Sequence, residues 1–256
     1  MKTICEKTKD REKFVKKIFY KFREEMEEIE GKKILIKPNI VSYEDYPTTT
    51  HPITLETVIK ELEGNDIIVG DAPAVDARNS DRIIKEHALN EVCERYGIKL
   101  LNLYKEKTVK PDKYSIRVFK ILLEADYVVS LPVLKTHRAC GITGALKNHF
   151  GFLPRFERIK MHMRLKDIHK SIAELNLLRK ADLYILDAIC VLIGAQEIRH
   201  GGTKRDLGYM IGGTDPLEID LLGLKLLKRV EPKLKEKEAE DILHIKHFID
   251  LFSSSR

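Results

Sequence analysis

The sequence predicts an α/β fold with a mainly parallel sheet that is covered by helices on both faces. Short apolar segments such as ILIK, IIVG, YVVSL and LYIL alternate with segments in which apolar residues recur at helical spacing. The short segments are apolar throughout, as is typical of strands buried on both faces. In such sheets ligands bind beyond the carboxyl ends of the strands, and we expect the ligand site there.

In the first half of the chain an opening helix is followed by three strands with helices between them. Gly31 and Gly64 follow helical segments at positions typical of a C-terminal cap. Thr54 and Ser80 are suited to begin helices, because their hydroxyl groups can accept a hydrogen bond from the first turn. The sequence predicts a helix over 14–29, a strand over 33–37, a helix over 55–63, a strand over 66–70, a helix over 80–96 and a strand over 98–103.

The second half continues the alternation. The sequence predicts a short helix near 119–124, a strand over 127–131, a loop and helix after Pro132, a helix near 169–179, a strand over 183–189, a Gly-rich turn over 200–208, a strand over 209–213, a helix after Pro216 and a charged final helix from about Glu236. We expect one α/β domain over 1–256, with a core over about 32–230 and a C-terminal helical element over 231–256.

Composition excludes several classes of protein. With 256 residues, 43% of them hydrophobic, the chain can bury a full-sized core without disulfides. The 46 basic and 40 acidic residues nearly balance and Trp is absent, which disfavours nucleic-acid binding. No stretch has the roughly 18 apolar residues of a membrane span or the pattern of a signal peptide. We therefore expect a cytoplasmic protein without a membrane partner.

Polar residues stand at the ends of four predicted strands. Lys37 and Asn39 end the first, Asp71 the second, Ser130 the fourth and Asp187 the fifth. Each of them alone fits a turn or a helix cap. Together they predict a shared polar site at one edge of the sheet.

The densest group of polar residues lies in LPVLKTHRACGITGALKNHFG, residues 131–151. Lysines supply positive charge, Thr and Asn side chains supply directional hydrogen bonds, and glycines let backbone N–H groups approach an anion. The spacing is not that of a P-loop, so a Walker-type nucleotide site is not expected. A helix N-terminus capped by Thr143, with Lys147 merely exposed, is the structural alternative. The candidate ligand-binding or catalytic residues here are Lys135, Thr136, His137, Thr143, Gly144, Lys147 and Asn148.

Two of these residues are candidates for catalysis, Lys135 and His137. An imidazole titrates near neutral pH, so His137 suits a general acid or base. Outside the segment, Asp215 follows a glycine pair at a predicted helix start, where it is either a ligand-binding residue or an N-cap.

The cysteines and histidines leave metal binding as an open alternative. The four cysteines form no CxxC pair, which argues against a zinc knuckle or a ferredoxin module within the chain. Imidazole and thiolate groups near the polar segment are nevertheless possible ligands, at irregular spacing that also fits packed or solvated side chains. The candidate metal ligands are His137, Cys140, His149 and His162.

Six motifs occur in a fixed order: IKPNIV, a Thr-His-Pro segment, IIVGDAP, LPVLKTH, TGALKNHFGFLP and IGGTDPLEID. With them, from about Lys37 to Asp220, the chain resembles the family known as domain of unknown function 362, whose members are often described as iron–sulfur-cluster proteins. LPVLKTH followed by TGALKNHFG is the most specific part. The positions that match the recurrent motifs are Lys37, Pro38, Asn39, Asp71, Lys135, Thr136, His137, Thr143, Gly144, Lys147, Asn148, Gly151, Asp215 and Asp220.

The resemblance implies the fold and the place of the site. Many members carry an appended ferredoxin-like segment with clustered cysteines, which this sequence does not contain. An iron–sulfur cluster is therefore expected only if a partner, such as a ferredoxin-like protein, shares it, whereas another metal stays an alternative for the candidate ligands of this chain.

Three hypotheses of function follow. The first is an enzyme acting on a small anionic, phosphorylated or carboxylated metabolite, which Lys135 and Lys147 bind and Thr143 and Asn148 orient, with His137 as acid or base. The second is a redox or metal-dependent protein that uses an iron–sulfur cluster or another metal. An isomerase of the lactate racemase type, with a metal cofactor, is a related alternative by analogy of layout. The third is a non-catalytic ligand-binding protein with the same site.

Overall fold

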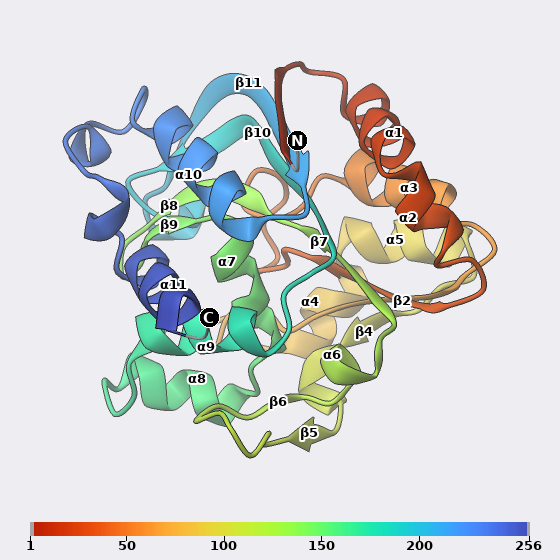
Figure 1. Cartoon of the computed structure of the whole chain (residues 1–256), viewed down its shortest axis with the longest axis horizontal. Helices are drawn as coiled ribbons and strands as arrows, with labels where there is room; N and C mark the ends of the chain where they lie inside the picture. The colour runs from red at the N-terminus through yellow and green to blue at the C-terminus, as the bar shows by residue number, and fades with distance from the viewer. Residues whose placement is uncertain (1–2, 255–256) are drawn as a thin grey trace.

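The protein is built around a mainly parallel sheet that lies between two layers of helices (Figure 1). The computed structural model describes residues 3–254. The nine-stranded sheet has the order β1-β11-β10-β7-β2-β3-β4, with β8 paired to β10 and β9 paired to β8. Its strands are β1 (Thr3–Lys7), β2 (Lys33–Pro38), β3 (Asp66–Asp71), β4 (Leu100–Asn102), β7 (Tyr127–Leu131), β8 (Val133–His137), β9 (Gly141–Thr143), β10 (Leu183–Ile193) and β11 (Thr203–Gly213), and a two-stranded sheet holds β5 (Thr108–Val109) and β6 (Val118–Phe119).

The sheet is parallel in its centre and antiparallel at one edge. β4, β3, β2, β7 and β10 are parallel in neighbouring pairs, and β8 is parallel to β10. β10, β11 and β1 are antiparallel. Lys37 pairs with Ser130 on β7, and Ile36 pairs with Val69 on β3. The carboxyl ends of β2, β3 and β7 therefore lie side by side.

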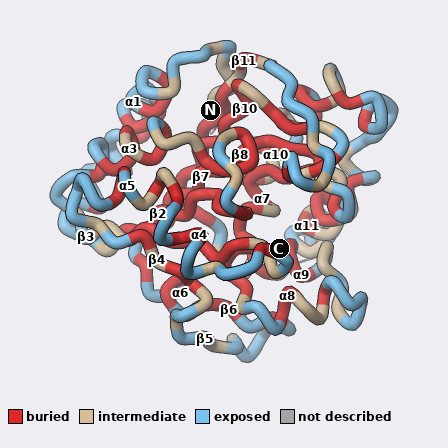
Figure 2. Tube along the Cα trace, turned by 180° about the vertical axis from the view of Figure 1, so that it is seen from behind, coloured by how far each residue is buried: buried red, intermediate tan, exposed pale blue. Residues whose placement is uncertain are grey.

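Helices cover both faces of this sheet. The buried apolar residues form two clusters, one on each face. Ile34 and Ile36 belong to one cluster and Leu35 to the other, because successive strand residues point to opposite faces. Figure 2 shows the buried sheet strands in red between exposed segments at the periphery. On the side of the cluster that contains Ile34 and Ile36 lie α1 (Arg11–Lys21), α2 (Arg23–Glu27), α3 (Pro52–Glu61), α4 (Ser80–Glu86) and α5 (Ala88–Arg95). On the side of the cluster that contains Leu35 lie α6 (Ile121–Glu124), α7 (Ala145–Asn148), α8 (Arg155–His162), α9 (Ile168–Leu178), α10 (Pro216–Leu227) and α11 (Leu243–Ser254).

The structure confirms the predicted α/β fold class, and the strands predicted over 33–37, 66–70 and 127–131 are β2, β3 and β7. These strands were recognisable because they are short, apolar and buried on both sides. None of the helices between residues 3 and 254 has both the length and the apolar character that a membrane span requires.

Two predicted helices are divided in the structure. The helix expected over 14–29 is interrupted at Phe22, whose φ of −104° and ψ of 24° separate α1 from α2. The helix expected over 80–96 is interrupted at His87, whose extended backbone separates α4 from α5. Apolar periodicity continues across both interruptions, so it does not reveal them.

Two predicted helix caps are one to three residues away from the observed ones. His51 caps α3 and its Nδ1 accepts a hydrogen bond from Ile53, because Pro52 occupies the first helical position and Thr54 lies inside the helix. Asn79 caps α4 in place of Ser80, with a left-handed φ of 57° that Asn tolerates.

The segments after Pro132 and Ile193 also differ from the prediction. The loop expected after Pro132 is a hairpin of β8 and β9, and the turn expected over 200–208 is largely the first half of β11, which pairs along β10. The final helix begins at Leu243 rather than near Glu236. β1 and α8 were not predicted.

Candidate functional site

A cavity of about 130 Å³ opens at the carboxyl ends of β2 and β3, against the β8–β9 hairpin and α7. Ten residues singled out in the sequence line this cavity together: Lys37, Asn39, Asp71, Lys135, His137, Thr143, Lys147, Asn148, Gly151 and His162.

The β8–β9 hairpin determines which residues of its sequence face the cavity. Lys135 pairs with Thr143 across the hairpin, and cross-strand partners share one face. Lys135 and His137 lie on that face, because side chains alternate along a strand. Thr136 is on the opposite face, where its hydroxyl group lies 3.4 Å from the carbonyl oxygen of Leu192.

A buried ion pair forms the floor of the cavity. The Lys37 amine lies 2.6 Å from the Asp71 carboxylate, and neither side chain is more than 3% exposed. The other Asp71 oxygen accepts a hydrogen bond of 2.6 Å from the Ile40 N–H group. Burial lowers the pKa of Lys37, and Asp71 opposes this effect. Gly151 is packed against the pair, since a Cβ atom there would lie 2.3 Å from Lys37 Cε and 2.4 Å from Asp71 Oδ1.

Lys135 ties the loop after β2 to the hairpin. Its amine donates hydrogen bonds to Asn39 Oδ1 at 2.6 Å and to the Thr48 carbonyl oxygen at 2.5 Å. Burial lowers the pKa of Lys135 to about 7, an effect that Glu197 opposes and Lys147 reinforces. Lys135 therefore has protein partners for its amine in the absence of a ligand.

Lys147 differs from Lys37 and Lys135 in this respect. Among residues 3–254 its amine has neither a hydrogen-bond partner nor an ion-pair partner, and it lies 3.9 Å from the centre of the Phe150 ring. Burial lowers the pKa of Lys147 to about 8, and the neighbouring cations Arg158 and Lys37 contribute to the decrease. An anion in the cavity would supply the missing partner.

Two buried oxygen atoms in the cavity wall also have no partner within the described chain. They are Thr143 Oγ1 and Asn148 Oδ1, from side chains that are 5% and 2% exposed. The Asn148 amide nitrogen is held by Ser130 Oγ at 2.9 Å, so the oxygen end of the amide is the unpartnered one. A buried polar atom without a partner costs about 1–3 kcal/mol, which a bound ligand or water would offset.

His137 is oriented by the backbone of its own hairpin turn. Its Nδ1 accepts hydrogen bonds from the N–H groups of Ala139 and Cys140, both at 3.2 Å. The proton of the neutral ring must then be on Nε2. Burial, followed by the charges of Lys147 and Lys135, keeps the pKa of His137 well below its usual value. The ring is therefore a neutral hydrogen-bond donor near neutral pH.

Gly144 and Asp215, which were predicted to bind ligand, do not line the cavity. A Cβ atom on Gly144 would lie 2.1 Å from Asp220 Oδ1. Asp220 in turn accepts hydrogen bonds from the N–H groups of Ala145 and Leu146 at the start of α7. Asp215 is the N-cap of α10, in agreement with the alternative considered from the sequence.

The predicted metal ligands do not converge. His137 and His162 line the cavity, whereas His149 packs between the rings of Phe152 and Tyr184, at 5.3 and 5.8 Å. Burial lowers the pKa of His149 to about 3. Cys140 is buried beside the hairpin turn, outside the cavity wall.

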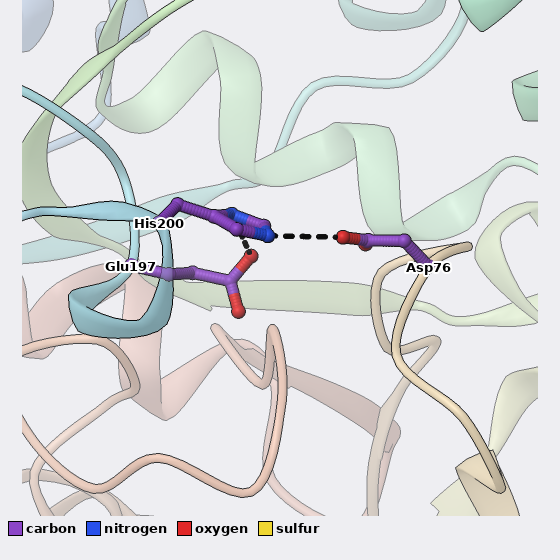
Figure 3. Close-up of side chains that lie close together, drawn as sticks. All are labelled: Asp76, Glu197 and His200. Atoms are coloured by element: carbon purple, nitrogen blue, oxygen red, sulfur yellow. Dashed lines mark ion pairs between the residues drawn. The ribbon is translucent and has the colours of Figure 1, made fainter.

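A cysteine-ligated iron–sulfur cluster does not fit the residues present. The four cysteines lie on separate elements, and no group of three potential metal ligands within residues 3–254 includes a cysteine. The group that does lie together is Asp76, Glu197 and His200, which the sequence had not indicated (Figure 3).

Several cavity residues have no sequence signal that identifies them. Arg158 on α8 donates to the carbonyl oxygens of Ala72 and Pro73 and holds the loop after β3 in place. Gln196 and Glu197 reach the cavity from the connection between β10 and β11. Their position depends on the pairing of these two long strands, which local patterns do not reveal.

Known proteins resemble the chain in sequence and in fold. It is 24% identical over 208 residues to a thylakoid-associated protein of Synechocystis, and the match covers 77% of this chain and 64% of the relative. The chain thus spans less than two thirds of the length of that protein.

The fold resembles that of the lactate racemase apoprotein from Thermoanaerobacterium thermosaccharolyticum, with a TM-score of 0.56 and 14% sequence identity, over 89% of this chain and 57% of the other. A crystal structure from Thermotoga maritima gives a TM-score of 0.46 at 13% identity, over 84% of this chain and 57% of that one. The likeness to the lactate racemase apoprotein is a likeness of fold alone. The family described as "Domain of unknown function (DUF362)" matches residues 34–225, and the chain therefore belongs to this family.

Proposed function

We propose that the protein is an enzyme that binds a small anionic metabolite, phosphorylated or carboxylated, in this cavity. The observation that carries the proposal is the Lys147 amine, which lies in the cavity wall and has neither a hydrogen-bond partner nor an ion-pair partner among residues 3–254. Thr143 and Asn148, on the same segment, add buried oxygens that have no hydrogen-bond partner in the part of the chain that the structure describes. A lysine supplies the charge for an anion, the Thr143 hydroxyl group can donate a hydrogen bond to it, and the Asn148 amide oxygen can accept one from a hydroxyl group of the metabolite.

The size and charge of the cavity support a small ligand. Its volume of about 130 Å³ is below the roughly 300–1,000 Å³ of sites for drug-sized ligands. Of the cations in its wall, Lys37 is neutralised by Asp71, whereas Lys147 is not in an ion pair within the described residues. This leaves positive charge available for a carboxylate or phosphate group.

The arrangement also supports proton-transfer chemistry. With a pKa near 8, Lys147 can exchange a proton close to neutral pH. His137 offers Nε2–H as a neutral donor, which suits the stabilisation of negative charge that develops on a substrate oxygen. This role differs from the acid or base role expected from sequence, because the backbone N–H groups of the hairpin turn occupy Nδ1.

Calorimetric titration with sulfate and with a panel of phosphorylated and carboxylated metabolites tests the anion site. Lys147→Met should weaken anion binding by about tenfold or more, as expected for the loss of a charged hydrogen bond worth about 1.5–3 kcal/mol. Lys160→Met is the matched control, because Lys160 also lies over a phenylalanine ring, 4.4 Å from Phe156, but outside the cavity wall. The proposal would be refuted if Lys147→Met and Lys160→Met weakened anion binding equally, or if Lys147→Met did not weaken it.

A non-catalytic binding protein would use the same cavity. Turnover of any ligand found by titration, followed by product analysis, separates an enzyme from a binding protein. The metal-dependent alternative is supported by other residues, at the mouth of the cavity.

A further inference from the structure

We propose that Asp76, Glu197 and His200 form a binding site for one divalent transition-metal ion at the mouth of the cavity. Asp76 lies in the loop after β3, and Glu197 and His200 lie in the connection between β10 and β11 (Figure 3). Asp76 and Glu197 also line the cavity itself. The site is separate from the proposed anion-binding residues.

The spacing of the three side chains fits a coordination sphere. One potential ligand atom from each lies within 4.8 Å of the others. His200 Nε2 is 3.2 Å from Asp76 Oδ2, and His200 Nδ1 is 3.3 Å from Glu197 Oε1. Two ligands that each lie about 2.0–2.2 Å from a metal ion are separated by roughly 2.8–3.6 Å, from octahedral to tetrahedral angles. Because the two contacts use different nitrogens of one ring, the imidazole turns to place a single nitrogen on an ion between the carboxylates.

A cation already occupies part of this space. The Arg199 guanidinium lies 2.7 Å from Glu197 Oε2 and 3.1 Å from Asp76 Oδ2. The single positive charge of Arg199 thus pairs with two carboxylates, and the one on Glu197 is buried. Arg199 is partly exposed, so its side chain can move into solvent when a divalent ion binds.

The backbone of the turn is held independently of that side chain. The Glu44 carboxylate accepts hydrogen bonds from the N–H groups of Ile198 and Arg199, at 2.8 and 2.6 Å. Displacement of the guanidinium therefore leaves Glu197 and His200 in position. Such support from neighbouring hydrogen bonds is typical of metal sites.

A second observation points to a ligand beside the three residues. Gln196 Oε1, next to Glu197 and in the cavity wall, is buried and has no partner within the described chain. The unpartnered oxygens of Thr143 and Asn148, both more than nine-tenths buried, belong to the same cavity wall. An amide oxygen is a suitable additional ligand for a hard divalent cation.

The donor atoms define the class of metal. One imidazole nitrogen with two carboxylates and no thiolate suits Mn²⁺, Fe²⁺, Co²⁺ or Zn²⁺ rather than a thiolate-bound cluster or Cu⁺. Co²⁺ is a convenient probe, because its visible absorption reports coordination directly.

The test is a titration of the chelator-treated, dialysed protein with Co²⁺, followed by calorimetry and visible absorption. We expect one Co²⁺ ion per chain and affinity at least tenfold lower for His200→Gln and Glu197→Gln. Arg199→Met should bind Co²⁺ at least as tightly as the unchanged protein, because the competing cation is absent. A network that only stabilises the fold would not give this result.

Two further variants keep the test decisive. His247→Gln is the matched control, because His247 also faces a carboxylate, Asp167, at 4.0 Å and lies outside the cavity. The affinity of this variant for Co²⁺ should equal that of the unchanged protein. Asp76→Asn repeats the test at a side chain that is 57% exposed, in case the change at buried Glu197 impairs folding. The proposal is overturned if neither the unchanged protein nor Arg199→Met binds Co²⁺, or if His247→Gln removes the binding instead.

Discussion

The Lys37 amine and the Asp71 carboxylate form an ion pair of 2.6 Å at the ends of two neighbouring parallel strands, out of contact with solvent. Removing one member of such a pair leaves an uncompensated buried charge and costs about 3–5 kcal/mol. Lys37→Met should therefore lower the free energy of unfolding by about this amount in denaturant titrations.

The double variant Lys37→Met, Asp71→Asn gives the control for this prediction. Asp71 accepts N–H hydrogen bonds from Ile40 and Ala72 on separate oxygens, so Asn keeps an acceptor for only one of them, but no buried charge remains. The double variant should lose less stability than the sum of the two single changes. Additive losses would show that the two groups do not interact energetically.

Gly151 allows the chain to approach this ion pair closely. A Cβ atom there would lie 2.3 Å from Lys37 Cε and 2.5 Å from its amine, so Gly151→Ala should displace Lys37 and weaken anion binding. Gly31→Ala is the control: its φ of 71° costs about 1–2 kcal/mol with alanine, but nothing lies near its Cβ position. Calorimetric titration with sulfate should show weaker binding only for the first variant.

The sequence predicted the residues at the ends of β2 and β3 because a local pattern is sufficient there. A short apolar strand followed by Lys37, Asn39 or Asp71 places these side chains at one edge of a parallel sheet, and they line one cavity. Their role in binding stays a prediction. His149 was misleading because it is two residues from Lys147, and residues two apart on a helix do not share a face.

The proposed metal ligands could not be predicted, for a different reason. Glu197 and His200 take their positions from the pairing of β10 with β11, and the sequence of β11 has glycines and charges that look like a turn. Asp76 lies 121 positions before Glu197, and only tertiary structure brings the two together. Local patterns do not contain such information.

Lys147 should make anion affinity depend on pH. Its pKa in the folded protein is lowered to about 8, so the ammonium form that binds an anion is present below pH 8 and is lost above it. Affinity for sulfate, whose charge is constant over this range, should fall by up to about tenfold per pH unit above pH 8. Lys147→Met should bind weakly at every pH. A constant affinity of the unchanged protein between pH 7 and 9.5 would contradict the assignment.

Asp220 should make the stability of the fold depend on pH in the opposite sense to an ordinary ion-paired carboxylate. Burial raises its pKa to about 7, although the N–H groups of Ala145 and Leu146 oppose this effect. Between the unfolded pKa of 3.8 and the folded value, the folded state retains a proton that the unfolded state loses, so the contribution of Asp220 to stability falls as pH rises from about 4 to 7.

Asp220→Asn isolates this contribution. The amide oxygen can still accept one of the two hydrogen bonds from the start of α7, and the loss of the other does not depend on pH, because the group no longer titrates. Relative to the unchanged protein, the variant should therefore gain free energy of unfolding as pH rises from 4 to 7, as measured by denaturant titration at several pH values. If the difference between the two proteins does not change with pH, Asp220 is ionised in the folded state throughout this range, and the N–H groups of α7 stabilise its charge more than burial destabilises it.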